Sequence, residues 1–387
     1  MSTGATVVVI GGGVIGASIA YHLALNGWRN VVVLDRGQGP GAGSTRKATG
    51  GYRAQFATPI NVRLSLLARD KLIRFREETG VDSGYQPVGY LWLAENARQL
   101  ELLRESQRMQ HQEGLVEAVE LGLDEIADVN PAISLDRVAG AAFCPTDGYI
   151  RPLEILRGYI GAGERLGVRF VWGEEMTSVT RESSGRITHI ATASNSYSAD
   201  NYVNAAGAWA STVASLAGVV VPVVPLRRQA AVTIPTDVLP ASMPMTIFME
   251  DDFHMRVRDG RVMLCWPSPE TPGEPPDLRA DSSWIDIVSA KGRERVPGLA
   301  NVEIDRAMCY AGLYEMSPDD HAIIGKSGEC ENLWLANGSS GHGVMHSPAI
   351  GHITADLISG RDPPVDVTQL RPSRFAEGAA IVSSELI

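Results

Sequence analysis

The sequence predicts an α/β fold that opens with a parallel β-sheet, and three consecutive segments carry this prediction. Residues Thr6–Ile10 are an unbroken β-branched run, which is typical of a strand buried on both faces. Residues Ala17–Leu25 place apolar side chains at helical spacing, and Asn26-Gly27 supplies a common helix ending. A second apolar run, Val31–Leu34, predicts the neighbouring strand. A strand, a helix and a second strand in about thirty residues indicate a βαβ unit.

Helical and strand-like segments continue along the chain, and the later part is richer in strands. Apolar residues at helical spacing predict helices, and alternating or continuous apolar runs predict strands. The stretch 37–58, rich in small residues, and the stretch 266–280, rich in proline, predict loops. The expected helices are 60–78, 96–112, 152–166, 284–295 and 348–358, and the expected strands are 85–94, 169–172, 186–205 and several within 225–265.

The composition is that of a folded, acidic protein. The 387 residues suggest two to three domains, and a formal net charge of −11 makes nucleic acid or an anionic membrane a poor partner. The four cysteines form no C-x-x-C pair, and no cluster of histidine and acidic residues has metal spacing, so we expect no metal and no disulfide framework. We find neither a secretory signal nor a bilayer-spanning run and expect a cytoplasmic protein.

The segment Gly11–Gly16 has the pattern G-x-G-x-x-G between the first predicted strand and the first predicted helix. In this context the pattern predicts a dinucleotide site. Gly11 permits a tight turn, Gly13 lets the backbone approach a pyrophosphate, and Gly16 lets the helix pack closely on the strand. The N–H groups and the dipole at the start of that helix stabilise phosphates.

Asp35 ends the second predicted strand, nineteen residues after Gly16. Its carboxylate can accept hydrogen bonds from both hydroxyls of a ribose, and an acid at this place disfavours a 2′-phosphate. NADP is therefore not expected, whereas the pattern alone leaves FAD and NAD open.

Four further segments resemble flavin motifs of the FAD-dependent amine oxidases, the superfamily of glycine oxidase, sarcosine oxidase and D-amino-acid oxidase. They occur in the family's order and, with the glycine motif, cover nearly the whole chain. The nearest types are the β-subunit of sarcosine oxidase and L-proline dehydrogenase, which share a G-S-T loop, a G-G-x-R segment and a G-H-G-x-M-H run. The four segments are Gly43–Arg53, Val203–Trp209, Gly312–His321 and Gly338–Met345.

The resemblance implies FAD as the cofactor and a task for each motif. Ser44 and Thr45 would donate hydrogen bonds to the pyrophosphate, and Gly50 and Gly51 would let the chain pass close to the isoalloxazine ring. Backbone N–H groups of the last motif would face the flavin N1–C2=O edge, where negative charge develops on reduction. The implied cofactor-binding residues are Gly11, Gly13, Val14, Ile15, Gly16, Asp35, Arg36, Ser44, Thr45, Thr49, Gly50, Gly51, Met176, Ala206, Gly207, Trp209, Gly338, Gly341, His342, Gly343, Val344 and Met345.

The resemblance also bears on how the flavin is attached. Monomeric sarcosine oxidases bind it covalently through a cysteine two residues before the tyrosine of the third motif. Gly312 stands at that position here, and Cys309 would point to the other face of a strand. We expect non-covalent FAD.

Four residues are candidates for the catalytic site. Arg53 matches the family's arginine for the substrate carboxylate, which a guanidinium binds bidentately. Tyr314 matches the active-site tyrosine, with a core tyrosine as the alternative. His254 alternates with Arg256 on a strand and faces either the pocket or solvent. Met345 replaces a lysine of the monomeric enzymes, and the adjacent His346 either contributes to the site or packs in the following helix.

All flavin motifs lie outside two inserts. This arrangement predicts a Rossmann-like FAD-binding domain assembled from segments 1–84, 145–224 and 302–387. Segments 85–144 and 225–301 would form a substrate-binding domain with a mostly antiparallel sheet.

The function implied by the resemblance is oxidation of the C–N bond of an amino acid or N-alkyl amino acid with a carboxylate, similar to sarcosine, glycine or proline. A hydride equivalent passes to flavin N5, and the imine product hydrolyses in water. No lysine occurs between Lys71 and Lys291, so the oxygen-activating lysine of some relatives is absent and a dehydrogenase or slow oxidase is favoured.

Three alternatives remain. The chain could be an FAD-binding β-type subunit that is active only in a multi-subunit assembly, with a second flavin at a subunit interface, or it could form a homo-oligomer. An NAD-dependent dehydrogenase is disfavoured because the G-S-T loop and the G-H-G run would then have no task.

Overall fold

The first sheet is built around the βαβ unit at the N-terminus. The computed structural model describes residues 2–267 and 278–382. Strand β1 (Ser2–Ile10) pairs in parallel with β2 (Val31–Asp35) on one side and with β11 (Ser196–Asn204) on the other. The sheet order is β17-β18-β11-β1-β2-β8, with β10 and β9 continuing from β11. The additional strands are β8 (Arg169–Trp172), β9 (Ser178–Arg181), β10 (Ile187–Ala191), β17 (Ile323–Lys326) and β18 (Leu333–Asn337).

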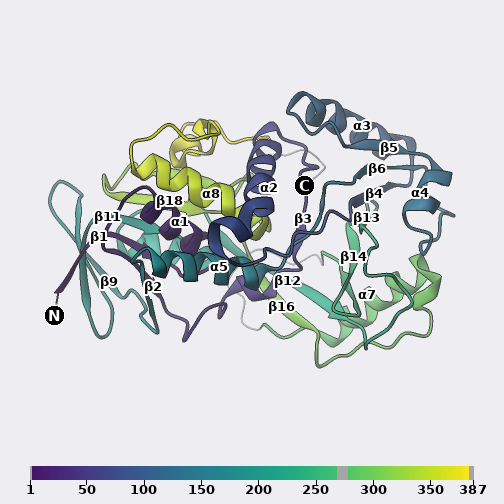
Figure 1. The fold of residues 1–387 in the computed structure, drawn as a ribbon, viewed down its shortest axis with the longest axis horizontal. Coiled ribbons are helices and arrows are strands. Elements are labelled where there is room, and N and C mark those ends of the chain that lie inside the picture. The colour runs from purple at the N-terminus through teal and green to yellow at the C-terminus, as the bar shows by residue number, and fades with distance from the viewer. Residues whose placement is uncertain (1, 268–277, 383–387) are drawn as a thin grey trace.

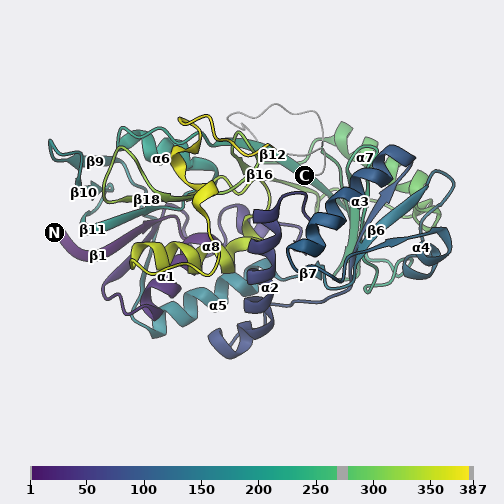
Figure 2. The same cartoon turned by 90° about the horizontal axis from the view of Figure 1, so that it is seen from above.

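Both faces of this sheet are covered, as the continuous apolar strands predicted. Val7 and Val9 of β1 belong to one hydrophobic cluster, whereas Val8 and Ile10 belong to another on the opposite face. Helix α1 packs against α5 and α8 on the first face, and Figure 2 shows these helices side by side. The helices are α1 (Val14–Leu25), α2 (Pro59–Thr79), α5 (Pro152–Arg165), α6 (Ala210–Leu216) and α8 (Gly343–Ile358).

The second sheet is antiparallel except where β13 pairs with β4 in parallel. It lies at the other end of the long axis of the molecule (Figure 1). Its strand order is β16-β12-β15-β14-β13-β4-β6-β5. The strands are β4 (Tyr90–Ala94), β5 (Val119–Leu121), β6 (Gly140–Cys144), β12 (Val224–Val232), β13 (Met245–Phe248), β14 (Phe253–Arg258), β15 (Arg261–Cys265) and β16 (Tyr310–Met316), and the helices around them are α3 (Ala97–Gln112), α4 (Leu123–Val129) and α7 (Ser282–Arg295).

Short elements complete the described part of the fold. A two-stranded ladder pairs β3 (Gly51–Tyr52) with β7 (Gly148–Tyr149). The 3₁₀ turns are η1 (Ser44–Lys47), η2 (Gly207–Trp209), η3 (Pro297–Leu299), η4 (Thr368–Leu370) and η5 (Pro372–Arg374). Strand β16 belongs to the second sheet although it falls within 302–387, so the sheets do not divide at that boundary. The predicted domain boundaries themselves stay a prediction.

Two helices begin three or more residues earlier than predicted. Helix α1 starts at Val14 rather than Ala17, directly after the extended Gly13. Helix α8 starts at Gly343 rather than 348, so Pro348 lies inside it. A proline inside a helix leaves the carbonyl four residues earlier without its usual donor. The Ser347 hydroxyl donates to that carbonyl, Val344 O, at 2.8 Å, which explains how the helix continues through the proline. Residues 268–277 of the predicted loop 266–280 lie outside the described residues.

Candidate active site

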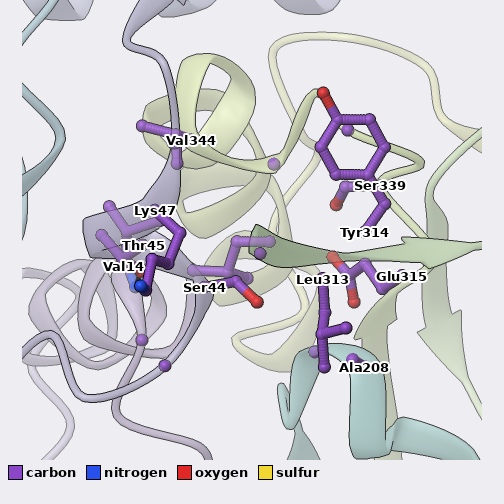
Figure 3. Close-up of a pocket in the computed structure, with 18 of the residues that line it drawn as sticks. Val14, Ser44, Thr45, Lys47, Ala208, Leu313, Tyr314, Glu315, Ser339 and Val344 are labelled. Carbon is purple, nitrogen blue, oxygen red and sulfur yellow. Dashed lines mark hydrogen bonds between the residues drawn. The ribbon is translucent and has the colours of Figure 1, made fainter. Parts of the chain in front are cut away.

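A cavity of about 540 Å³ lies between the two sheets and receives residues from both. Its walls include all the predicted cofactor residues except Gly16 and Gly338, and three of the four predicted catalytic residues, Arg53, His254 and Tyr314. Figure 3 shows part of it, with Val14 and Thr45 on one side and Tyr314 and Glu315 on the other. We call the part near Gly11, Asp35 and Met176 the α1 end, and the part near Arg53 and Tyr314 the Arg53 end.

At the α1 end the chain is packed so closely that glycine is required. Gly11 has a φ of +108°, and a Cβ on it would lie 2.3 Å from Ala205 O. A Cβ on Gly16 would lie 1.9 Å from Gly11 O, so Gly16 lets α1 approach β1 without itself reaching the cavity. The N–H of Val14 donates to Thr45 Oγ1 at 3.2 Å. The positive end of α1 therefore faces a cradle of suitable size and charge for a phosphate.

Asp35 closes the α1 end at the tip of β2. Its Oδ2 accepts from Gly12 N at 2.7 Å and its Oδ1 accepts from Gly37 N at 2.6 Å. Each carboxylate oxygen retains a second acceptor position, which a ribose hydroxyl can use. The guanidinium of Arg36 stacks 3.9 Å from the centre of the Trp209 ring, beside Met176 in the cavity wall.

The second flavin-like motif lies next to Gly11. Ala205 N donates to Ile10 O at 2.8 Å, and the Asn204 side chain holds the turn by accepting from Ala206 N at 3.1 Å and donating to Ala210 O at 2.9 Å. Gly207 has a φ of +57°. Asn204 is fully buried, and its role was not predicted because an asparagine in a strand gives no local signal of its partners.

Helix α8 brings a second helix N-terminus to the cavity. Gly341 has a φ of +94°, and a Cβ on it would lie 2.5 Å from the Tyr314 ring. The first N–H groups of α8, from Gly343 onward, have no partner within the helix, and Gly343, Val344 and Met345 all line the cavity. Gly338 does not line it. Its φ of +69° forms the turn that leads into this segment.

Gly50 and Gly51 line the cavity, but the space for their side chains is taken by the protein itself. A Cβ on Gly50 would lie 2.6 Å from Ile150 O, and one on Gly51 would lie 1.9 Å from the Tyr90 hydroxyl. These contacts account for both glycines without a flavin clash. The Arg256 guanidinium fixes this loop by donating to Thr49 O and Gly50 O, each at 2.8 Å.

Arg53 is a buried cation in the cavity wall. Its side chain is 8% exposed and lies between the rings of Phe56, at 4.1 Å, and Trp92, at 5.0 Å. One Nη contacts His342 Nε2 at 3.2 Å, and the other donates to Gln55 O at 3.3 Å. Burial lowers the pKa of Arg53, and burial together with the Arg53 charge holds the pKa of His342 well below its usual value. His342 is therefore neutral and can accept from Arg53.

Asp147 fixes the backbone that follows Arg53, a role that was not predicted from the sequence. Its Oδ1 accepts from Ala54 N at 2.7 Å, and its Oδ2 accepts from Gln55 N at 3.3 Å. The side chain is fully buried, and burial raises the pKa of Asp147 to about 6 against the effect of these hydrogen bonds.

Tyr314, His254 and Asp252 line the same cavity as Arg53. Burial raises the pKa of Tyr314 and lowers that of His254. His254 Nδ1 contacts Asp252 O at 2.9 Å, which makes Nδ1 the protonated nitrogen of a neutral ring. His254 thus faces the cavity rather than solvent. Burial raises the pKa of Asp252, which the charges of Arg53 and Arg228 partly oppose.

His346 does not line the cavity. Its Nε2 lies 2.7 Å from the Ser65 hydroxyl, and its ring packs against Phe56 and His342. Burial lowers the pKa of His346 to about 3. Of the two alternatives for this residue, the structure shows packing within the helix.

No described cysteine is placed for flavin attachment as a thiolate. Cys309 lies outside the cavity wall and contacts Val232 N at 3.4 Å, and a Cβ on Gly312 would lie 2.8 Å from Lys47 Cβ. Cys265 does line the cavity, but burial raises its pKa to about 12, so its thiol stays protonated.

The described residues show neither a metal site nor a membrane-spanning helix. No group of three or more histidine, cysteine or acidic side chains is arranged around a common point, as a metal would need. Within the same residues, every helix is too short or too polar to cross a membrane.

Comparisons with known proteins agree with this geometry. A model of the family described as FAD dependent oxidoreductase matches residues 6–357. The mitochondrial dimethylglycine dehydrogenase of Rattus norvegicus is 28% identical over 392 residues, which cover 96% of this chain but 45% of that protein. The glycine oxidase of Geobacillus kaustophilus is 25% identical to this chain. The match covers 95% of this chain and 96% of that protein. The solved L-proline dehydrogenase from P. horikoshii superposes with a TM-score of 0.89 at 26% identity, covering 98% of this chain and 99% of that one. The chain thus spans less than half the length of the rat dimethylglycine dehydrogenase.

Proposed function

This chain belongs to the family of FAD-dependent oxidoreductases, and from that premise we propose that it oxidises the C–N bond of a small amino acid or N-alkyl amino acid. Its cofactor is FAD, which supplies the acceptor for a hydride equivalent when bound. The glycine cradle at the α1 end, where a Cβ on Gly11 would meet backbone, fits the pyrophosphate of that cofactor. We also propose that the FAD is held without a covalent bond.

The observation that carries the proposal is the buried guanidinium of Arg53 at the other end of the same cavity. The guanidinium is buried and lines the cavity, and a carboxylate is the anion that its planar fork binds best. The names of the three relatives contain glycine, dimethylglycine and proline, which all have a carboxylate one carbon away from nitrogen. Arg53 would therefore orient the carbon between these two groups.

Neighbouring side chains support such a pose. The Tyr314 hydroxyl stays protonated because burial raises its pKa, so it can donate to a carboxylate oxygen. His254 and His342 stay neutral, and the Trp92 ring lies 5.0 Å from the guanidinium. The amine must be uncharged to release a hydride equivalent, and a wall that already holds a cation disfavours an ammonium.

An anaerobic substrate panel tests the proposal. The purified full chain with bound FAD is mixed with glycine, sarcosine, dimethylglycine and D- and L-proline, and with methylamine, dimethylamine, trimethylamine and pyrrolidine as matched amines without a carboxylate. We expect at least one amino acid to bleach the oxidised flavin and its matched amine to react more than a hundredfold slower. Equal rates for an amino acid and its amine would contradict the role of Arg53.

A second candidate is an FAD-binding subunit or part that works only in a larger assembly. It is favoured by one observation, that this chain spans only 45% of the rat dehydrogenase. In that case the isolated chain binds FAD but no member of the panel bleaches it. We also propose that the chain is divided into two domains and that the protein is cytoplasmic. It would form a homo-oligomer or a hetero-oligomer.

A further inference from the structure

Glu315 is a buried carboxyl in the cavity wall that the proposed reaction does not use. Its side chain is on the face of β16 opposite the Tyr314 ring, beside Leu313 and Ala208 (Figure 3). The residue is 9% exposed, and its Oε2 is shielded from solvent without receiving a hydrogen bond from any described residue. A buried acceptor without a donor is destabilising, so this oxygen indicates a missing partner.

Ser339 presents a second shielded group next to it. Its hydroxyl, in a residue that is 3% exposed, also makes no hydrogen bond within the described residues. Burial raises the pKa of Glu315 to about 7, and the polar groups of Ser339 and Gly338 lie close enough to oppose that rise although the Ser339 hydroxyl is not within hydrogen-bonding geometry. A neutral carboxylic acid and a hydroxyl can each donate and accept, so together they match a ligand whose groups also do both.

The pair lies between the two helix N-termini. A Cβ on Gly343, the first residue of α8, would lie 3.2 Å from Ser339 Cβ and 3.4 Å from Ile15 Cδ1 in the first turn of α1. The N-terminus of α1 suits the pyrophosphate, and the Arg53 end suits the ring and the substrate. In FAD the segment between the pyrophosphate and the ring is the ribityl chain, a row of hydroxyl groups.

We propose that the Glu315 carboxyl and the Ser339 hydroxyl bind hydroxyl groups of the ribityl chain of FAD. The proposal rests on FAD occupying this cavity. A polyol hydroxyl can donate a hydrogen bond to Oε2, and it can accept one from the acid or from the Ser339 hydroxyl. The apolar neighbours Leu313 and Ala208 can do neither. Burial favours the protonated form of this acid, and that form also avoids repulsion with the pyrophosphate.

The test compares two flavins in three forms of the full chain. One flavin is FAD, and the other is an FAD analogue whose ribityl hydroxyls are replaced by hydrogen. Dissociation constants are measured without substrate for the wild type, Glu315→Leu and Glu315→Gln. Met316→Leu is the matched control, since Met316 is the next residue of β16 and lines the same cavity without a hydrogen-bonding donor.

We expect the wild type and Met316→Leu to bind FAD at least roughly tenfold more tightly than the analogue, the effect of about one hydrogen bond to a strong partner. In Glu315→Leu this preference should shrink several-fold because FAD affinity falls while analogue affinity stays, and the contact of Ser339 remains. Glu315→Gln, which keeps a donor and an acceptor, should restore most of it. Melting temperatures of the variants show whether they are folded.

Two results would overturn the inference. One is an unchanged preference for FAD in Glu315→Leu, which would mean that water is the partner of Oε2. The other is equal loss of both flavins in Glu315→Leu and Glu315→Gln, which would make Glu315 purely structural. A wild type that bound no FAD would instead remove the cofactor assignment on which the inference depends.

Discussion

The walls at the two ends of the cavity are made of different parts of the chain. At the α1 end the wall is mostly backbone, with glycines at Gly11 and Gly207 in the left-handed region and a helix N-terminus behind them. At the Arg53 end the wall is made of large side chains from several strands, among them Trp92, His254 and Tyr314.

The two ends should therefore tolerate different substitutions. A wall of backbone groups works only if no Cβ intervenes, so a single methyl group can close it. A wall of side chains can exchange one group for a similar one and lose only the contacts of that group.

Gly16→Ala should cause the largest loss. The new Cβ would lie 1.9 Å from Gly11 O, a backbone atom that cannot rotate away, so α1 must separate from β1. We expect the free energy of unfolding to fall by more than about 3 kcal/mol and bound FAD to be lost. Thermal melting and flavin content of the purified protein measure both effects. Gly328→Ala, at an exposed glycine with no atom within 4 Å of its Cβ, should behave as wild type. A Gly16→Ala variant with full flavin content would show that the α1 end tolerates side chains.

Arg53→Ala should leave FAD bound and lower kcat/KM by the equivalent of about 2–5 kcal/mol, because one member of a desolvated charge pair is removed. Arg53→Lys keeps the charge but loses the fork, so it should mainly raise KM. Steady-state kinetics per bound flavin provide the measurement. The control is Arg46→Ala, an exposed arginine in the same loop. Loss of flavin with unchanged turnover per bound flavin would show that Arg53 binds the cofactor and not the substrate.

How much the sequence could predict follows the same division. The α1 end was predictable because Gly11, Gly16 and Asp35 stand at fixed spacing within one βαβ unit, where local geometry decides their roles. At the Arg53 end the resemblance supplied Arg53 and Tyr314. Trp92 and Asp147 were not predicted, since their positions depend on how β4 and the turn before β7 pack against a distant loop.

Residue environment was harder to predict than residue proximity. His346 is adjacent to a predicted motif, yet α8 turns it toward Ser65 and away from the cavity. Glu315 lies inside the third flavin-like motif, Gly312–His321. An acid in an alternating strand can also face solvent, and only the structure shows that this carboxyl is buried.

Asp147→Asn should have an intermediate effect. An amide that replaces the carboxylate sets an N–H against Ala54 N or Gln55 N, which leaves a buried donor unmatched and shifts the backbone beside Arg53. We expect a loss of about 1–3 kcal/mol in the free energy of unfolding and a rise in KM with a smaller change in kcat. An unchanged KM would show that Arg53 does not need this support. Asp200→Asn, at an exposed acid, is the control.

The same variant tests the pH dependence of stability. The folded-state pKa of Asp147 is raised to about 6, above that of the unfolded chain, so the folded state binds more protons between these values. This carboxyl therefore stabilises most below about pH 4 and loses that contribution as pH rises to 6, by about 1.4 kcal/mol per pH unit. The difference in unfolding free energy between wild type and Asp147→Asn should shrink from pH 4 to pH 6 and stay constant above it. A difference that grows with pH would contradict the raised pKa.

Trp92→Phe should have the smallest effect, although it changes a large side chain in the wall of the Arg53 end. Trp92 Nε1 is shielded and makes no hydrogen bond to the described residues, so its N–H adds a desolvation cost that phenylalanine removes. Phenylalanine also buries less area, and its ring attracts the Arg53 guanidinium, which lies 5.0 Å from the Trp92 ring, less strongly. These losses nearly cancel the gain from removing the N–H. We expect the free energy of unfolding in urea to change by less than about 1 kcal/mol. Trp284→Phe is the matched control because Trp284 is equally buried but donates to Trp266 O at 3.3 Å, and it should lose about 1–2 kcal/mol. If Trp92→Phe were the more damaging substitution, the N–H would have a partner in the working enzyme, and the Arg53 end would depend on individual polar atoms as strictly as the α1 end depends on its glycines.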